Sequence, residues 1–175
     1  MTKNEETKLE HLLTNSHKAE MIAYMESHPG DFTEVIKLAI ADKQPYSWRA
    51  SWLLWSCMVK NDKLVSKYLK KIIDILPKRK DNQQRELLMI LQRMELNEEY
   101  EGQLFDACTN IWGQVGKNPS LRYNAFKLMV SISKKHPGLI GEINSLTESY
   151  YTDTLSDNVK KSITKLMYDL TKTNY

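Results

Sequence analysis

Apolar side chains recur along this chain at the spacing of amphipathic α-helices. They return every three or four positions within runs separated by Pro, Gly, Asn and Asp, which is the period of one helix face. Gly and Pro number only 6 and 5, which disfavours a turn-rich β fold. The pattern predicts an all-α protein of about ten helices, at residues 4–14, 17–27, 31–42, 45–60, 63–76, 81–95, 98–113, 119–135, 138–150 and 156–172.

Several predicted helices begin at residues suited to a helix start. Asn118 stands before Pro119: the asparagine side chain accepts from free N–H groups of the first turn, and proline at the first helical position loses no hydrogen bond. Asp81 and Asp157 are also good N-cap types. A His-Pro-Gly tripeptide occurs at 28–30 and again at 136–138, and each copy predicts the end of one helix and the start of the next.

A repeat of about 37 residues runs through the pattern. The basic residues Arg49, Arg85, Arg122 and Lys160 are spaced by 36, 37 and 38 residues. Three and six positions after each basic residue stands an apolar one, namely Trp52, Trp55, Leu88, Leu91, Ala125, Leu128, Ile163 and Leu166. Matched apolar positions at a fixed period indicate stacked helical repeats, in which neighbouring units bury one another's apolar faces.

The segment Asn118-Pro119-Ser120-Leu121-Arg122 resembles the Asp-Pro-x-Val-Arg motif that opens the second helix of a HEAT repeat, and residues 81–85 and 157–160 are looser copies. The resemblance to the HEAT-repeat, armadillo-type family implies a right-handed α-α superhelix in a single domain spanning 1–175. Residues 31–172 would form four helix pairs, and residues 1–30 would form two N-terminal capping helices. Such folds commonly serve as platforms for other macromolecules.

Composition restricts the class of protein only loosely. The net charge of +3 neither requires nor excludes a nucleic-acid partner. No stretch is long and apolar enough to predict a membrane span or a signal peptide, and the two cysteines show no metal-ligand spacing. We therefore expect a cytoplasmic protein whose thiols are reduced and buried, without metal, membrane contact or cofactor.

Signatures of catalysis are missing from the sequence. It contains no Gly-rich phosphate loop, no HExxH and no GxSxG motif, and its four histidines have no paired ligand spacing. We expect no catalytic residue, and the sequence favours a protein without enzymatic activity but does not decide the question.

The most distinctive local feature of the sequence is a group of three tryptophans. Trp48, Trp52 and Trp55 fall on one face of the predicted helix 45–60. They could offer an aromatic platform to a flat ligand, but they occupy the positions that other repeats fill with core residues, so we expect Trp52 and Trp55 to be largely buried. The basic column at Arg49, Arg85, Arg122 and Lys160 likewise has two interpretations: a phosphate-binding row, or a structural ladder that binds helix-end carbonyls and acids between repeats. We favour the ladder.

The second helix of each pair carries a second apolar stripe, away from the expected core. We predict that this stripe and its basic edge form a partner-binding groove on the concave face, made by Leu54, Met89, Ile90, Arg93, Tyr123, Phe126, Lys127 and Lys165. The alternative is that close packing covers these residues, in which case they form a second core.

Two functions remain open. The first is a non-catalytic binding or scaffold module that recognises a protein or peptide partner. The second is nucleic-acid binding, because the tryptophans together with the basic stretch 60–85, which has nine basic and three acidic residues, resemble features of the HEAT-like DNA alkylation-repair glycosylases. We favour the first.

Overall fold

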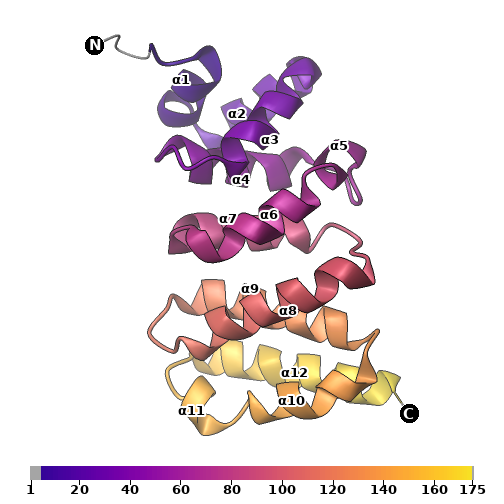
Figure 1. The fold of residues 1–175 in the computed structure, drawn as a ribbon. Helices are drawn as coiled ribbons and strands as arrows, with labels where there is room; N and C mark the ends of the chain where they lie inside the picture. Colours follow the sequence, from indigo (N-terminus) through magenta and orange to yellow (C-terminus); the bar gives the residue numbers. More distant parts are fainter. Residues whose placement is uncertain (1–4, 175) are drawn as a thin grey trace. The chain divides into compact units, whose positions relative to one another are not determined.

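The computed structural model describes residues 5–174, and within that range it contains α-helices and short 3-10 helices but no strand. The predicted all-α class is confirmed. The chain divides into two compact units, residues 1–95 and 96–175, each made of helices packed side by side (Figure 1). The prediction of one domain over 1–175 stays a prediction.

The first unit begins with two short helices that precede the helix pairs. Its elements are α1 (Lys8–Asn15), α2 (Lys18–Ser27), the 3-10 helix η1 (Pro29–Asp31), α3 (Phe32–Ile40), α4 (Tyr46–Cys57), α5 (Lys63–Ser66), α6 (Leu69–Ile75), the 3-10 helix η2 (Leu76–Lys78) and α7 (Asp81–Leu91).

Helix α4 is the centre of the first unit. It contacts α1, α2, α3 and α7, and in Figure 1 it lies between the N-terminal helices and α7. Its buried face consists of small and apolar residues, including Ala50, Leu53 and Leu54. Ser51 is also buried, and its hydroxyl donates to the carbonyls of Ser47 and Ala39 at 2.9 and 3.1 Å. The small side chains let α3 pack closely, and the buried Ser51 hydroxyl keeps its acceptors.

The second unit has the same plan of packed antiparallel neighbours. Its elements are α8 (Glu98–Gly113), α9 (Pro119–Ser133), the 3-10 helix η3 (Pro137–Leu139), α10 (Ile140–Ser145), α11 (Ser149–Thr152) and α12 (Asp157–Thr173). Helix α9 contacts α8 on one side and α12 on another. Ten of its residues are buried and they cover most of its circumference, as expected for a helix enclosed by neighbours.

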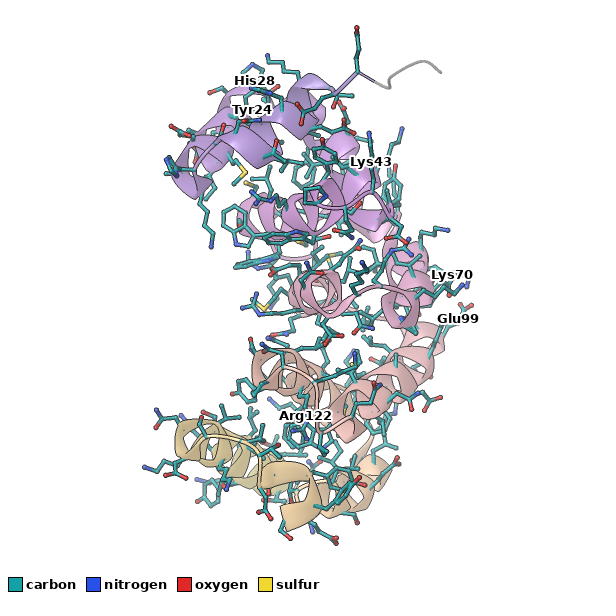
Figure 2. The ribbon with its side chains drawn as sticks, turned by 90° about the vertical axis from the view of Figure 1, so that its left-hand side faces the viewer. Tyr24, His28, Lys43, Lys70, Glu99 and Arg122 are labelled. Carbon is teal, nitrogen blue, oxygen red and sulfur yellow. The ribbon has the colours of Figure 1, made fainter. Side chains whose placement is uncertain are left out.

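Arg122 is the most deeply placed charged side chain of the second unit. It is fully buried, and its guanidinium donates to the Trp112 carbonyl at 2.9 Å, the Tyr151 carbonyl at 2.6 Å and the Thr154 hydroxyl at 3.3 Å. The same group lies over the Trp112 ring, 4.5 Å from its centroid. Burial lowers the pKa of this guanidinium. Figure 2 shows Arg122 enclosed by side chains, whereas Lys70 and Glu99 project from the surface. Arg122 therefore joins the ends of α8 and α11 to α9.

Helix boundaries follow the sequence closely, with two exceptions. Predicted helices 63–76 and 138–150 are each broken in two, so the described residues form twelve α-helices rather than ten. At both breaks the backbone bonds tighten to the i−3 pattern, from Tyr68 N–H to the Val65 carbonyl at 2.8 Å and from Thr147 N–H to the Asn144 carbonyl at 3.1 Å. Each break is a short stretch of i→i−3 hydrogen bonding, which the spacing of hydrophobic residues does not predict.

The expected helix starts are partly confirmed. Asn118 caps α9, with its side chain accepting from Ser120 N–H at 2.8 Å and Pro119 at the first helical position. The expected caps at Asp81 and Asp157 are wrong by one residue, because each lies inside the first turn, where its charge favours the helix dipole. Both His-Pro-Gly tripeptides open a 3-10 helix, the first directly after the end of α2 and the second three residues after the end of α9.

The cysteines were expected to be reduced and buried. Both are free of disulfide bonds. Cys108 is buried, but Cys57 is only half-buried at the end of α4. The expected burial of Cys57 is therefore wrong.

Replacing Arg122 with alanine is expected to destabilise the protein strongly. Arg122→Ala leaves the Trp112 and Tyr151 carbonyls without these donors, and each unsatisfied buried group costs about 1–3 kcal/mol. We expect a loss of about 3–5 kcal/mol in the free energy of unfolding, measured by urea titration. Lys160→Ala, at the same repeat position but half-buried, is the control and should cost little. Equal effects of both changes would contradict the structural role of Arg122.

Candidate functional site

A hollow in the first unit combines aromatic and basic side chains, and we call it the Trp–Arg pocket. It lies between α2, α4 and α7 and has a volume of about 440 Å³. Its walls are formed by Ser16, His17, Lys18, Met21, Trp48, Arg49, Trp52, Trp55, Arg85 and Glu86. This volume lies within the range of about 300–1,000 Å³ typical of ligand sites.

Helix geometry places the three tryptophans in this pocket. Trp48, Trp52 and Trp55 are four and three positions apart, so they share one face of α4. The other side of α4, with Leu53 and Leu54, carries the buried contacts. Trp48, Trp52 and Trp55 are each mostly buried but not fully so, which agrees with the expectation for Trp52 and Trp55. The part of each ring that stays accessible lines the pocket. The chain turns at residues 16–18 between α1 and α2 and forms a rim of the pocket rather than a cover.

Cations lie over the indole rings. The Lys18 ammonium is 4.9 Å from the Trp52 ring centroid, and the Arg49 guanidinium is 5.1 Å from that of Trp48. Arg93, which follows α7, lies 5.7 Å from the Trp55 ring centroid. Each contact pairs a positive charge with the electron-rich face of an indole. These contacts hold the aromatic rings and the charges in one place before any ligand arrives.

Glu86 orders the α7 side of the pocket. This carboxylate is buried, and one of its oxygens accepts a hydrogen bond from the Trp55 indole N–H. The other oxygen accepts from Arg85 at 2.7 Å. Both oxygens are therefore engaged, and the charge of Glu86 is matched by Arg85. The pocket has one acidic residue in its lining against Lys18, Arg49 and Arg85, so its walls are net positive.

The four basic residues at the repeat position differ in role: some bind carbonyl groups inside the protein, and some line the Trp–Arg pocket. Arg122 is wholly structural, as the ladder interpretation expects. Arg49 does both, because one guanidinium nitrogen donates to the Leu13 carbonyl at 3.0 Å while the side chain also lines the pocket. Arg85 lines the pocket, and Lys160 lies at a shallow depression on α12. The ladder is thus confirmed at Arg122 and is partial at Arg49.

The HEAT repeat domain model matches residues 5–170 of the chain. The chain belongs to the HEAT repeat domain family. The match covers both units and every helix from α1 to α11, together with most of α12, so the resemblance expected from residues 118–122 is confirmed. No curated protein and no solved structure matches this HEAT-repeat protein.

The described part of this HEAT-repeat protein contains neither a metal-binding cluster nor a helix that could span a membrane. Residues 5–174 contain no cluster of three or more His, Cys, Asp or Glu side chains placed to hold a metal ion. Over the same range, no helix has the length and hydropathy needed to cross a bilayer.

The predicted groove residues of the first unit are mostly inside the protein. Leu54 and Ile90 are fully buried, whereas Met89 and Arg93 are half-buried. Arg93 donates to the Met58 carbonyl at 3.3 Å. The expected exposure of Leu54 and Ile90 is therefore wrong, because helices pack on more than one side of α4 and α7.

In the second unit, Phe126, an aromatic residue of the predicted groove, is also inside the protein. Phe126 is fully buried against Trp112, with ring centroids 4.7 Å apart. Tyr123 and Lys127 are half-buried and paired, the ammonium lying 5.1 Å from the tyrosine ring centroid. Lys165 is exposed on α12. Phe126 thus belongs to a second core, and the open apolar stripe expected through it is not present.

Sequence reasoning missed the residues that face the tryptophans. None of the eight predicted groove residues lines the Trp–Arg pocket. Lys18, Met21 and Glu86 do, and they come from α2 and α7. The repeat period marked the tryptophan column, but no signal in the sequence indicates which side chains of distant helices lie opposite it.

The pocket's charge can be checked with ionic quenchers of tryptophan fluorescence. We expect iodide to quench more strongly than caesium at equal ionic strength, because the net positive walls concentrate anions near three of the four indoles. Trp112, which is fully buried, should remain protected from both. Lys18→Gln should reduce the advantage of iodide. Equal quenching by the two ions would show that the walls are not net positive in solution.

Partly exposed tryptophans should matter less for stability than their fully buried neighbours. Leu53→Ala empties a fully buried position and is expected to cost about 2–5 kcal/mol in the free energy of unfolding. Trp52→Ala should cost less, about 1–3 kcal/mol, because part of the indole is already in contact with water in the native state. Chemical denaturation of the two variants gives the comparison. A loss in the free energy of unfolding that is larger for Trp52→Ala than for Leu53→Ala would contradict this prediction.

Proposed function

We propose that this HEAT-repeat protein is a non-catalytic binding module that recognises a protein or peptide partner through the Trp–Arg pocket. The observation that supports the proposal is the set of three partly exposed indoles on α4, each held beside a cation. Tryptophan and arginine are the residues most enriched at the energetic centres of protein interfaces. Their placement in a hollow favours a short inserted segment over a flat contact.

The pocket is organised before binding, which lowers the entropic cost of association. Trp55 is fixed by Glu86, and Arg49 is fixed by the Leu13 carbonyl. Side chains that are already ordered lose little rotamer freedom when a partner binds. A micromolar affinity would require about 8 kcal/mol of net binding free energy.

The nucleic-acid alternative has weaker support. A glycosylase-like chemistry would need a free acid beside the bound base, and the acid of this pocket, Glu86, uses both oxygens within the protein. The basic stretch 60–85 is also partly neutralised, since Lys70 pairs with Asp74 at 3.1 Å. Arg79 of the same stretch donates to the Ile40 carbonyl at 3.0 Å. These contacts favour a protein partner.

The proposal is tested by selecting peptides from a displayed random library on the immobilised full chain. We expect enriched peptides whose affinity falls at least tenfold on Trp52→Ala. Tyr168→Ala is the matched control, because it removes an exposed aromatic ring on α12 that does not line the pocket. Circular dichroism confirms that both variants remain helical.

Two results would contradict the proposal. The first is enrichment that is unchanged by Trp52→Ala, which would place peptide binding elsewhere. The second is tight binding of duplex or single-stranded DNA at physiological salt that is lost on Trp52→Ala, because contacts to phosphates alone weaken steeply as salt rises. That outcome would favour the nucleic-acid function.

A further inference from the structure

We infer that the Trp–Arg pocket selects a peptide segment in which an anionic side chain stands directly beside an aromatic one. The anion would contact Lys18 and Arg49, and the aromatic ring would lie against Trp52 and Trp55. The inference rests on the proposed function and adds the chemistry of the partner.

The first step concerns unmatched positive charge. Glu86 is paired with Arg85, so it does not compensate the other cations of the pocket. Within residues 5–174, neither Lys18 nor Arg49 forms an ion pair with an acidic side chain. The pocket therefore carries two positive charges without acidic partners.

Arg49 has donors that no protein group accepts. Within residues 5–174 its guanidinium makes one hydrogen bond, from a terminal nitrogen to the Leu13 carbonyl, and the side chain lines the pocket. Its Nε is buried without an acceptor, so the terminal nitrogens are the donors available to an occupant. A guanidinium offers five donors in a planar fork that matches an oxyanion. A carboxylate or phosphate entering the pocket would supply acceptors and an opposite charge together, which water or a neutral amide does not.

The third step concerns the shape of the aromatic wall. Trp52 and Trp55 meet edge to face, with ring centroids 6.2 Å apart and planes inclined by 75°. Two nearly perpendicular rings form a corner in which one further ring can stack on one indole while its edge meets the other. Met21 adds an apolar, adaptable side chain to the same lining.

The cations and the indole corner are adjacent in the pocket, because Lys18 lies over Trp52 and Arg49 over Trp48. Consecutive Cα atoms of a peptide are about 3.8 Å apart, whereas successive side chains of an extended strand point to opposite faces. A ring and an anion on adjacent residues therefore reach both parts of the pocket when the peptide backbone turns between them.

The experiment uses four short peptides with acetylated and amidated ends, each carrying a fluorescent label. Their central pairs are Asp-Phe, Asn-Phe, Asp-Ala and phosphoserine-Phe, and binding to the full chain is measured by fluorescence anisotropy. We expect Asp-Phe to bind at least tenfold more tightly than Asn-Phe and Asp-Ala. The phosphoserine arm separates the two sources of the anion: tighter binding than Asp-Phe assigns a phosphate, and equal or weaker binding assigns a carboxylate.

Two charge variants locate the interaction. Lys18→Gln and Arg49→Gln should each reduce the preference of Asp-Phe over Asn-Phe to less than threefold. Lys18→Gln keeps the test valid even if Arg49→Gln fails to fold, because Lys18 is exposed. Lys70→Gln removes the same charge from an exposed position outside the pocket, visible in Figure 2, and should leave the preference intact.

The outcomes distinguish this inference from the proposed function. If Asn-Phe binds as well as Asp-Phe, the anion preference is overturned while a pocket that binds peptides remains. The same holds if none of the four peptides binds although library peptides depend on Trp52. If the library itself yields no peptide that depends on Trp52, the proposed function and this inference both fail.

Discussion

Stacked helices bury the carbonyl ends of their neighbours, and these carbonyls require donors. A helix leaves its last carbonyl groups without partners in the helix itself, and here side chains from other helices supply them. Gln83 donates to the Ala39 and Ala41 carbonyls at the end of α3, at 2.8 and 3.0 Å. Trp112 donates to the Leu146 carbonyl at 2.9 Å, directly after α10. Each such bond fixes one helix against the end of another.

This requirement explains why long polar side chains stand in the cores. Gln83 and Arg122 are fully buried, yet their donors reach helix ends. A buried polar group is tolerated only when its hydrogen bonds are made. Arg49 meets the requirement with one nitrogen at Leu13, and its side chain also lines the Trp–Arg pocket. At the candidate site, a side chain that binds a helix-end carbonyl also has hydrogen-bond donors that the protein does not use.

Much of the fold was accessible from the sequence because helix periodicity and cap chemistry are local. Asn118 and Pro119 predicted the start of α9 correctly. The repeat period indicated stacked helical repeats, and the resemblance of residues 118–122 to a HEAT motif indicated the family. Burial was predicted less well, since it depends on how many neighbours a helix has. Phe126 was expected on an open face, but α9 is enclosed by α8 and α12. Trp52 was expected in a core, and it is mostly buried, but part of its ring lines the hollow between α2, α4 and α7.

The pocket was only partly predictable for the same reason. The tryptophan column was visible at residues 48, 52 and 55, whereas Lys18 and Glu86 are distant in sequence and joined to it only by folding. No local signal encodes such a pairing.

The walls of the Trp–Arg pocket come from three helices that are separate along the chain. The N-terminal helices α1 and α2 pack on the rest of the first unit through α4, and terminal segments of this kind open and fray most readily. An occupant touching Lys18, Trp52 and Arg85 would bridge α2, α4 and α7. Occupancy would therefore hold α2 against α4 and α7. As a result, it would slow amide hydrogen exchange in the first two helices.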